Sequence, residues 1–219
     1  MTIKAILFDL DGVLVESEKA HFKALEELLA QYGKPTPKEW FLPMIGMDND
    51  ESANFILKET GLSMTVQEMN DFRFENVIRI LTTIGEPKEG TKELLNNCEQ
   101  QNLSLAVASN SPPRYVNAVL DALQLKDKFI GIVTAYDVPE GKPAPDVYLE
   151  AARRLKVNPA ECIGVEDSLL GLQALIAAKM TSVAVPNPYL SVTDFGEADY
   201  VFDSLSEFND RLPELIGGN

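Results

Sequence analysis

The sequence has few cysteines and no long hydrophobic runs. Its 219 residues include only two cysteines, Cys98 and Cys162. Two thiols so far apart do not make a disulfide framework, so we expect a reduced protein in the cytoplasm. No stretch approaches about 18 consecutive apolar residues, so we expect no membrane-spanning helix. Asp9 and Asp11 interrupt the early apolar run, which is unlike a signal peptide.

Positive charge is also scarce. The chain has 19 Lys and Arg against 34 Asp and Glu, which gives a net charge of −15 at pH 7. Nucleic acids and anionic membranes are bound through basic surfaces, so this charge argues against both as partners. A small anionic substrate is compatible with it where a site is locally positive. The absence of a Gly-x-Gly-x-x-Gly after the first apolar run excludes a nucleotide-binding Rossmann protein.

Apolar runs alternate with segments of helical periodicity over most of the chain. We expect strands at 4–9, 103–109, 129–135, 161–167, 181–185 and, shorter, 199–202. The helices between and after them are expected at 90–100, 113–123, 144–155, 168–178 and 204–215. This alternation indicates an α/β fold with a parallel sheet and right-handed connections. The strands are continuously apolar, as expected when helices cover both faces of the sheet.

The segment between the first two strands has no strand pattern. Helical periodicity covers 18–32, 50–60 and 65–83 instead. We therefore predict two domains: a catalytic α/β core formed by 1–16 and 86–219, and an inserted helical domain formed by 17–85.

Polar side chains follow the predicted strands where each one ends. They are Asp9 and Asp11, Ser109 and Asn110, Lys142, and Glu166 and Asp167. In open α/β sheets ligands lie beyond the carboxyl ends of the strands, so we expect this set to converge. Strand alternation would point Asp9 and Asp11 the same way, with a repulsion of about 3 kcal/mol at roughly 5 Å and a dielectric near 20. A chain that only had to fold would avoid this cost, so a cation or a reaction is expected there.

Converging carboxylates indicate a hard cation, and an all-oxygen site suits Mg²⁺. Mg²⁺ commonly takes substrate phosphate oxygens as further ligands, and Lys142 and Ser109 can hold such oxygens. One Asp can attack phosphorus while a second protonates the leaving oxygen and later activates water. The residues therefore predict phosphoryl transfer.

Four stretches carry a family resemblance: "DLDGVLVES", "VASNS", "GKPAPDVY" and "GVEDSLLGLQA". In order and spacing they resemble the four motifs of the haloacid dehalogenase superfamily. The resemblance is to its subgroup with a helical cap, which contains sugar-phosphate phosphatases and β-phosphoglucomutases. It implies a Rossmann-like parallel sheet of order 5-4-1-2-3 with an inserted all-helical cap domain.

The resemblance also implies roles for the polar residues. Asp9 resembles the nucleophile and Asp11 the general acid/base. Mg²⁺ would be bound by Asp9, the Asp11 main-chain carbonyl and Asp167, with Glu166 assisting. The phosphoryl group would be bound by Ser109, Asn110 and Lys142. Dehalogenases of the superfamily lack the second Asp, so its presence implies phosphoryl transfer.

Each residue also has a purely structural interpretation. Asp9 and Asp11 could close a turn, Ser109 could cap a helix, and Lys142 could be solvated. Glu166 and Asp167 could simply lie at a helix N-terminus, where acidic residues are favoured. His21, in the first cap helix, is either a residue near the hinge that contacts substrate or an ordinary helix residue.

The cap departs from its relatives at the segment 45–52. Members that act on sugar bisphosphates usually carry an Arg there, whereas this segment has Asp48, Asp50 and Glu51. Arg is suited to gripping a second phosphate, so its absence weakens the mutase interpretation. Arg73, Arg79 or Lys58 could supply the missing positive charge from the other cap helices. Arg73 lies near where relatives place a basic cap residue and is, with His21, our cap candidate for substrate contact.

We expect a monomeric Mg²⁺-dependent phosphatase that hydrolyses a small phosphorylated metabolite, a sugar or polyol phosphate, through an aspartyl phosphate. The alternative is a hexose phosphomutase of the β-phosphoglucomutase type, an isomerase. A third hypothesis is a catalytically weak member that binds phosphometabolites or a protein partner, against which the complete motif set argues.

Overall fold

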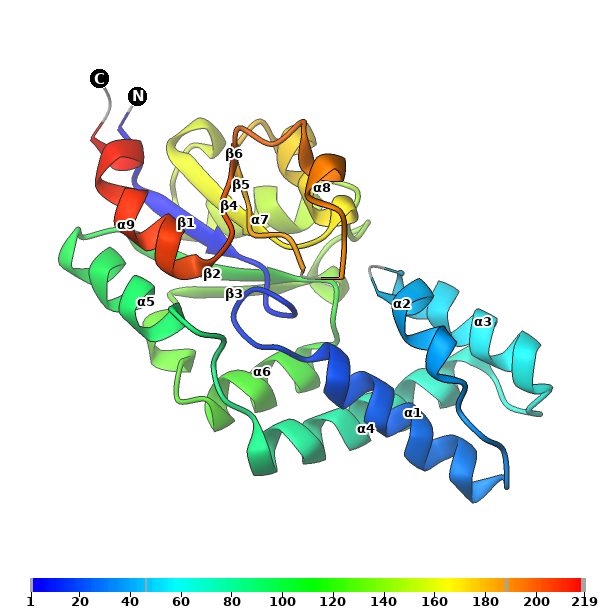
Figure 1. The fold of residues 1–219 in the computed structure, drawn as a ribbon. Helices are drawn as coiled ribbons and strands as arrows, with labels where there is room; N and C mark the ends of the chain where they lie inside the picture. Colours follow the sequence, from blue (N-terminus) through cyan, green and yellow to red (C-terminus); the bar gives the residue numbers. More distant parts are fainter. Residues whose placement is uncertain (1, 46, 188, 218–219) are drawn as a thin grey trace. The chain divides into compact units, whose positions relative to one another are not determined.

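The computed structural model describes residues 2–45, 47–187 and 189–217. The chain divides into two compact units, which are coloured along the sequence in Figure 1. The sheet unit consists of Met1–Glu16 and Glu86–Asn219, and the helical unit consists of Ser17–Gly85.

The sheet unit is built on a parallel sheet. Its strands, within the described residues, are β1 (Ala5–Phe8), β2 (Ser104–Ser109), β3 (Gly131–Thr134), β4 (Cys162–Glu166), β5 (Thr181–Ala184) and β6 (Tyr200–Val201). The order across the sheet is β3-β2-β1-β4-β5-β6, and every neighbouring pair is parallel. This confirms the predicted parallel α/β architecture, since the first five strands have the predicted order, read from the opposite edge.

Helices cover both faces of this sheet. They are α5 (Thr91–Gln100), α6 (Pro113–Ala122), α7 (Asp146–Leu155), α8 (Leu169–Ala178) and α9 (Leu205–Ile216). Figure 1 shows α7 and α8 on one face, with α5, α6 and α9 on the other. The strands are apolar on both sides because both sides are covered; all four residues of β1 are buried, for example.

Close packing between the sheet and α8 depends on one glycine. A Cβ on Gly164, in the middle of β4, would lie 1.9 Å from Cδ2 of Leu175 on α8. The leucine fills the space that a side chain would need. The same side of the sheet buries Leu7, Val133 and Tyr148, which form one core with Leu175.

The strand register brings the ends of the central strands to one level. Phe8, the last residue of β1, is paired with Val107 on β2 and Val165 on β4. The main-chain N–H of Asp9 continues the ladder by donating to the carbonyl of Val165 at 3.0 Å. The residues that immediately follow these positions therefore lie together at the carboxyl end of the sheet.

The helical unit has its own core. Its helices are α1 (Glu18–Gln31), α2 (Phe41–Met44), α3 (Asn49–Thr60) and α4 (Val66–Ile84). Its core side chains are Leu25, Leu28, Leu29, Ala53, Ile56 and Met69. Both α3 and α4 begin with a capping box, Asp48 with Glu51 and Thr65 with Glu68. The short α2 was not predicted, because four residues are too few to show helical periodicity.

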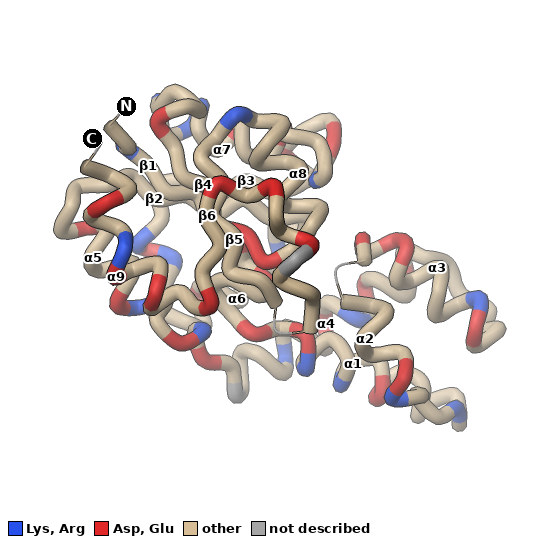
Figure 2. Tube along the Cα trace, turned by 45° about the horizontal axis from the view of Figure 1, so that its top comes forward, with Lys and Arg blue, Asp and Glu red and all other residues tan. Residues whose placement is uncertain are grey.

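Acidic residues lie on both units (Figure 2). Among the described residues, none of the helices combines the length and the apolar character needed to span a membrane.

Candidate active site

The predicted site residues of the sheet unit come from the carboxyl ends of β1, β2 and β4 and from the loop before α7. Asp9 follows β1, Ser109 ends β2, and Glu166 ends β4. The side chains of the predicted set that are buried are Asp9, Ser109, Lys142, Glu166 and Asp167. Polar groups are withdrawn from water only at a cost, so such a buried set needs internal partners.

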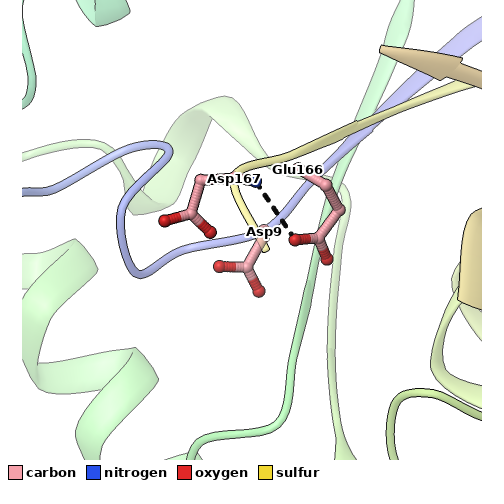
Figure 3. A group of neighbouring side chains, drawn as sticks. All are labelled: Asp9, Glu166 and Asp167. Carbon is pink, nitrogen blue, oxygen red and sulfur yellow. Dashed lines mark hydrogen bonds between the residues drawn. The ribbon is translucent and has the colours of Figure 1, made fainter. Parts of the chain in front are cut away.

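Three carboxylates converge here. One oxygen from each of Asp9, Glu166 and Asp167 lies within 4.8 Å of the others (Figure 3). The end of β4 supplies two of them, and the main-chain N–H of Asp167 donates to Glu166 Oε2 at 3.3 Å. The Asp167 carboxylate is held from the other side by Asn187, whose Nδ2 donates to Oδ2 at 3.2 Å. Sequence reasoning missed Asn187, which lies 20 residues further on.

Lys142 supplies a buried positive charge to this group. Its ammonium is ion-paired with Asp9 Oδ1 and, at 2.7 Å, with Glu166 Oε1. It also donates to the carbonyl of Ala108 at 2.8 Å and lies 5.0 Å from the centre of the Tyr148 ring, a cation–π distance. Burial lowers the pKa of Lys142, but the nearby carboxylates of Asp9 and Glu166 raise it by more. The pKa of Lys142 therefore lies above its ordinary value.

The negative charges in this group outnumber the positive one. The pKa of Asp9 is raised to about 8, because burial, first of all, and then Glu166 and Asp11 raise it by more than Lys142 lowers it. Three carboxylates and one ammonium thus leave room for additional positive charge. Oxygen donors in this number are ligands for a hard divalent cation, so the residues present fit a metal ion of that kind.

Glu166 is fixed by neutral partners as well as by Lys142. The Tyr148 hydroxyl donates to its Oε1 at 2.5 Å, and Ser168 Oγ donates to its Oε2 at 3.1 Å. Gly171 on α8 leaves space for the carboxylate, because a Cβ there would meet it at 1.9–2.1 Å. Tyr148, Ser168 and Gly171 lie within the quoted motifs, but sequence reasoning gave them no role.

Asp11 lies apart from the three carboxylates. Its Oδ1 accepts from the Tyr115 hydroxyl at 2.5 Å and its Oδ2 from Ser111 Oγ at 2.9 Å. The expected strand alternation does not extend to Asp11, because β1 ends at Phe8. The chain then turns at Gly12, which has φ of +76°, a conformation that favours glycine.

Ser109 and Asn110, the predicted phosphate ligands at the end of β2, have different local roles. The Ser109 hydroxyl oxygen accepts from the main-chain N–H of Ser111 at 3.0 Å, which leaves its own hydrogen for another acceptor. The amide of Asn110 instead bonds the main chain of Lys142, donating to its carbonyl at 3.1 Å and accepting from its N–H at 2.8 Å. Asn110 therefore fixes the loop that carries Lys142.

The two cap candidates both lie in the helical unit. His21 is on α1, with its ring centre 5.9 Å from that of Phe74 in an edge-to-face arrangement. Arg73 is on α4 and is buried, with Nη1 donating to Ser52 Oγ at 2.9 Å. Burial lowers the pKa of Arg73 to about 10.

The acidic segment 45–52 has structural roles of its own. Asp48 caps α3 by accepting from the main-chain N–H groups of Asp50 and Glu51, and Asp50 accepts from Asn70 Nδ2 at 2.8 Å. Gly46, within the segment, lies outside the described residues.

The four strand-end motifs can be compared directly with a known family. The family model for haloacid dehalogenase-like hydrolases matches residues 3–179. The chain belongs to this family. The match includes all the predicted site residues of the sheet unit, and it confirms the family resemblance inferred from the motifs.

Relatives of this hydrolase include proteins of two activities. It is 30% identical to hexitol phosphatase B of Escherichia coli K12, over 98% of this chain and 97% of the relative. It is also 30% identical to the β-phosphoglucomutase of Bacillus subtilis 168, over 84% of this chain and 83% of the relative. Among solved structures, CbbY from Rhodobacter sphaeroides in complex with phosphate has a TM-score of 0.84 at 28% identity, over 94% of this chain and 96% of that one.

Proposed function

We propose that this hydrolase is a Mg²⁺-dependent phosphatase acting on a small phosphorylated metabolite, a sugar or polyol phosphate. The observation that supports this most strongly is the buried group of three carboxylates around Lys142, with Asp11 two residues beyond Asp9. The name of hexitol phosphatase B, which is similar over nearly the whole chain, supports the substrate class.

In the proposed reaction, a carboxylate oxygen of Asp9 attacks phosphorus. The new bond joins Asp9 to phosphorus, the bond from phosphorus to the leaving oxygen breaks, and Asp11 gives that oxygen its proton. Asp11 then removes a proton from water, which attacks the aspartyl phosphate, releases inorganic phosphate and restores Asp9.

The remaining residues bind the metal ion or the phosphoryl group, or hold in place a residue that does so. Mg²⁺ would be held by Asp9, the main-chain carbonyl of Asp11, Glu166 and Asp167. When bound, it would reduce the electrostatic repulsion between an anionic phosphate and the attacking carboxylate. The phosphoryl oxygens are bound by the Lys142 ammonium and by the hydrogen that Ser109 has available. Asn110 acts through Lys142 by fixing its loop.

Residues 17–85 are proposed to act as a cap domain for a catalytic domain formed by 1–16 and 86–219. His21 and Arg73 are its candidates for substrate contact. The protein is proposed to work as a monomer in the cytoplasm, with neither nucleic acid nor membrane as partner.

The experiment is phosphate release from a panel of sugar, polyol and other metabolite phosphates, with and without Mg²⁺. We expect release that depends on Mg²⁺ and is lost in Asp9→Asn. Asp121→Asn is the matched control, because Asp121 is an exposed partner of Lys126 away from the site. Unchanged turnover in Asp9→Asn would contradict the nucleophile assignment.

A phosphomutase is the second candidate, because a β-phosphoglucomutase is among the relatives. Both activities pass through an aspartyl phosphate and differ in whether water or a sugar hydroxyl takes the phosphoryl group. NMR of β-glucose 1-phosphate with a bisphosphate activator separates them, since a mutase gives the 6-phosphate and a phosphatase gives inorganic phosphate. No turnover on either test, with a melting temperature still raised by phosphate or Mg²⁺, would favour a binding protein.

A further inference from the structure

Two hydroxyl groups from one short segment hold the carboxyl group of Asp11. Tyr115 donates to Oδ1 at 2.5 Å and Ser111 donates to Oδ2 at 2.9 Å, so each oxygen has its own donor. Ser111 and Tyr115 lie about a hundred residues from Asp11 in sequence, Ser111 between β2 and α6 and Tyr115 in the first turn of α6. Neither residue has a role in the reaction proposed above.

The two donors are themselves firmly placed. The main-chain N–H of Ser111 donates to the Ser109 hydroxyl at 3.0 Å, which ties it to the end of β2. Pro112 and Pro113 follow, and proline at the start of α6 fixes the backbone as the helix begins. Tyr115 is in the first turn of that helix, is fully buried, and donates its main-chain N–H to the Pro112 carbonyl at 2.9 Å.

We propose that Tyr115 and Ser111 are positioning residues for Asp11, which set the direction in which its carboxyl group delivers a proton. This inference rests on the proposed function, in which Asp11 protonates the leaving oxygen. A general acid must lie within hydrogen-bond reach of that oxygen, and a carboxyl group free to rotate does so only part of the time.

The hydrogen bonds also accommodate both protonation states of Asp11. In the acid, Oδ2 carries the proton, and the Ser111 hydroxyl donates to the lone pair that remains on Oδ2. Oδ1 stays bound to Tyr115, whose buried ring leaves its hydroxyl little freedom. When the phosphorus–oxygen bond breaks, the leaving oxygen takes the proton from Oδ2, and both hydroxyl groups still donate to the carboxylate. The proton that Asp11 later removes from water restores the acid.

The dependence of rate on the leaving group distinguishes positioning from a general structural effect. A p-nitrophenolate is a stable anion and leaves with little help from an acid, whereas a sugar or polyol alkoxide needs its proton during transfer. The ratio kcat/KM reports steps up to the transfer of the phosphoryl group to Asp9, so slow hydrolysis of the aspartyl phosphate does not mask the difference.

The test compares kcat/KM of Tyr115→Phe for p-nitrophenyl phosphate and for the best alkyl phosphate of the panel. General acids contribute about 10²–10⁴-fold, so partial misplacement is expected to cost about 10-fold or more with the alkyl phosphate and less than about 3-fold with the aryl one. The matched control is Tyr148→Phe, which removes an equally buried hydroxyl from another site carboxylate, Glu166. Its loss should be the same for both substrates.

Equal losses for the two substrates in Tyr115→Phe, or no loss with the alkyl phosphate, would overturn the inference. Ser111→Ala is the second variant. We expect a smaller loss of kcat/KM than in Tyr115→Phe, again confined to the alkyl phosphate. If Tyr115→Phe does not fold, Ser111→Ala alone tests the inference. Asp11→Asn separates this inference from the proposed function. A selective alkyl loss in Asp11→Asn but in neither hydroxyl variant refutes only the positioning role, while equal losses in Asp11→Asn refute Asp11 as the acid.

Discussion

Replacing Gly171 by alanine tests the packing that holds Glu166 in place. Gly171 is the third residue of α8, and a Cβ there would lie 1.9–2.1 Å from the carboxylate atoms of Glu166. A real side chain never approaches so closely, so the Glu166 carboxylate must move. It cannot do so without losing contacts, because Tyr148, Ser168 and Lys142 all bind it.

The opposing contributions can be estimated from general magnitudes. Gly→Ala in a helix interior stabilises by about 1 kcal/mol. Forcing extra atoms into a packed interior costs about 1–3 kcal/mol. Losing one hydrogen bond to the charged carboxylate costs about 1.5–3 kcal/mol more. The losses exceed the gain, so we expect Gly171→Ala to lower the free energy of unfolding by about 1.5–5 kcal/mol.

The assay is urea unfolding of the variant and the parent protein in EDTA, followed by calorimetric titration with Mg²⁺. Groups that orient metal ligands typically contribute about 10–100-fold to metal affinity, so we expect Mg²⁺ to bind at least about 10-fold more weakly to Gly171→Ala. Mg²⁺-dependent phosphate release should fall with it.

A double-mutant cycle with Glu166→Ala isolates the clash. Without the Glu166 carboxylate the new methyl group has room, so in that background Gly171→Ala should stabilise by up to about 1 kcal/mol. The effect of the same substitution thus changes sign between the two backgrounds. The same stabilisation of about 1 kcal/mol in both backgrounds, with unchanged Mg²⁺ affinity, would show that Gly171 is not needed to accommodate Glu166.

Two further substitutions test other parts of the molecule. Lys142→Met leaves the buried carboxylates of Asp9 and Glu166 without their cation, so in EDTA it should lower the free energy of urea unfolding by about 3–5 kcal/mol. Mg²⁺ should recover part of this loss by binding the folded state; an unchanged midpoint in EDTA would contradict the pairing. Asp48→Ala removes the cap of α3 and should cost about 1 kcal/mol in thermal unfolding. Asp48→Ser keeps a capping oxygen, so a cost as large as that of alanine would argue against the cap.

The arrangement of the sheet unit could be predicted because its pattern is simple. Strands such as β2 and β4 are short apolar runs between helices of about ten residues, and this alternation admits few parallel arrangements. The helical unit was predicted less completely. Residues 41–44 form a helix that contains Pro43, and its single turn leaves no periodic signal.

The site was predicted as a set of residues but not as an arrangement. The rule that ligands lie at the carboxyl ends of parallel strands is enough to select Asp9, Lys142 and Glu166. It does not say which side chains bond which, because Tyr148, Asn187 and Tyr115 reach the carboxylates from other parts of the chain. Such partners depend on how helices pack on the sheet, and no local pattern encodes that.

The acidic residues of segment 45–52 have a local structural role that sequence reasoning did not recognise. The absence of Arg from this segment, where Asp48, Asp50 and Glu51 stand instead, was the sequence evidence against binding a second phosphate. In the structure Asp48 and Glu51 form the capping box of α3, where acidic side chains satisfy free main-chain N–H groups. Their acidity follows from the position at which the helix begins, whereas weak binding of a second phosphate, inferred from the missing Arg, stays a prediction.

The different tasks proposed for Asp9 and Asp11 follow from their partners, since the two side chains are chemically the same. Asp9 lies among charged groups, paired with Lys142 and close to Glu166 and Asp167. An ammonium can only donate, so it favours the ionised carboxylate that attack on phosphorus requires. Asp11 is bonded by the hydroxyls of Ser111 and Tyr115, which can donate both to a carboxylate and to the lone pairs that remain on the acid. Hydroxyl partners can bond a carboxyl group in both of its protonation states, whereas a fixed positive charge favours only the ionised one. They therefore suit a residue that must gain and lose a proton in each cycle.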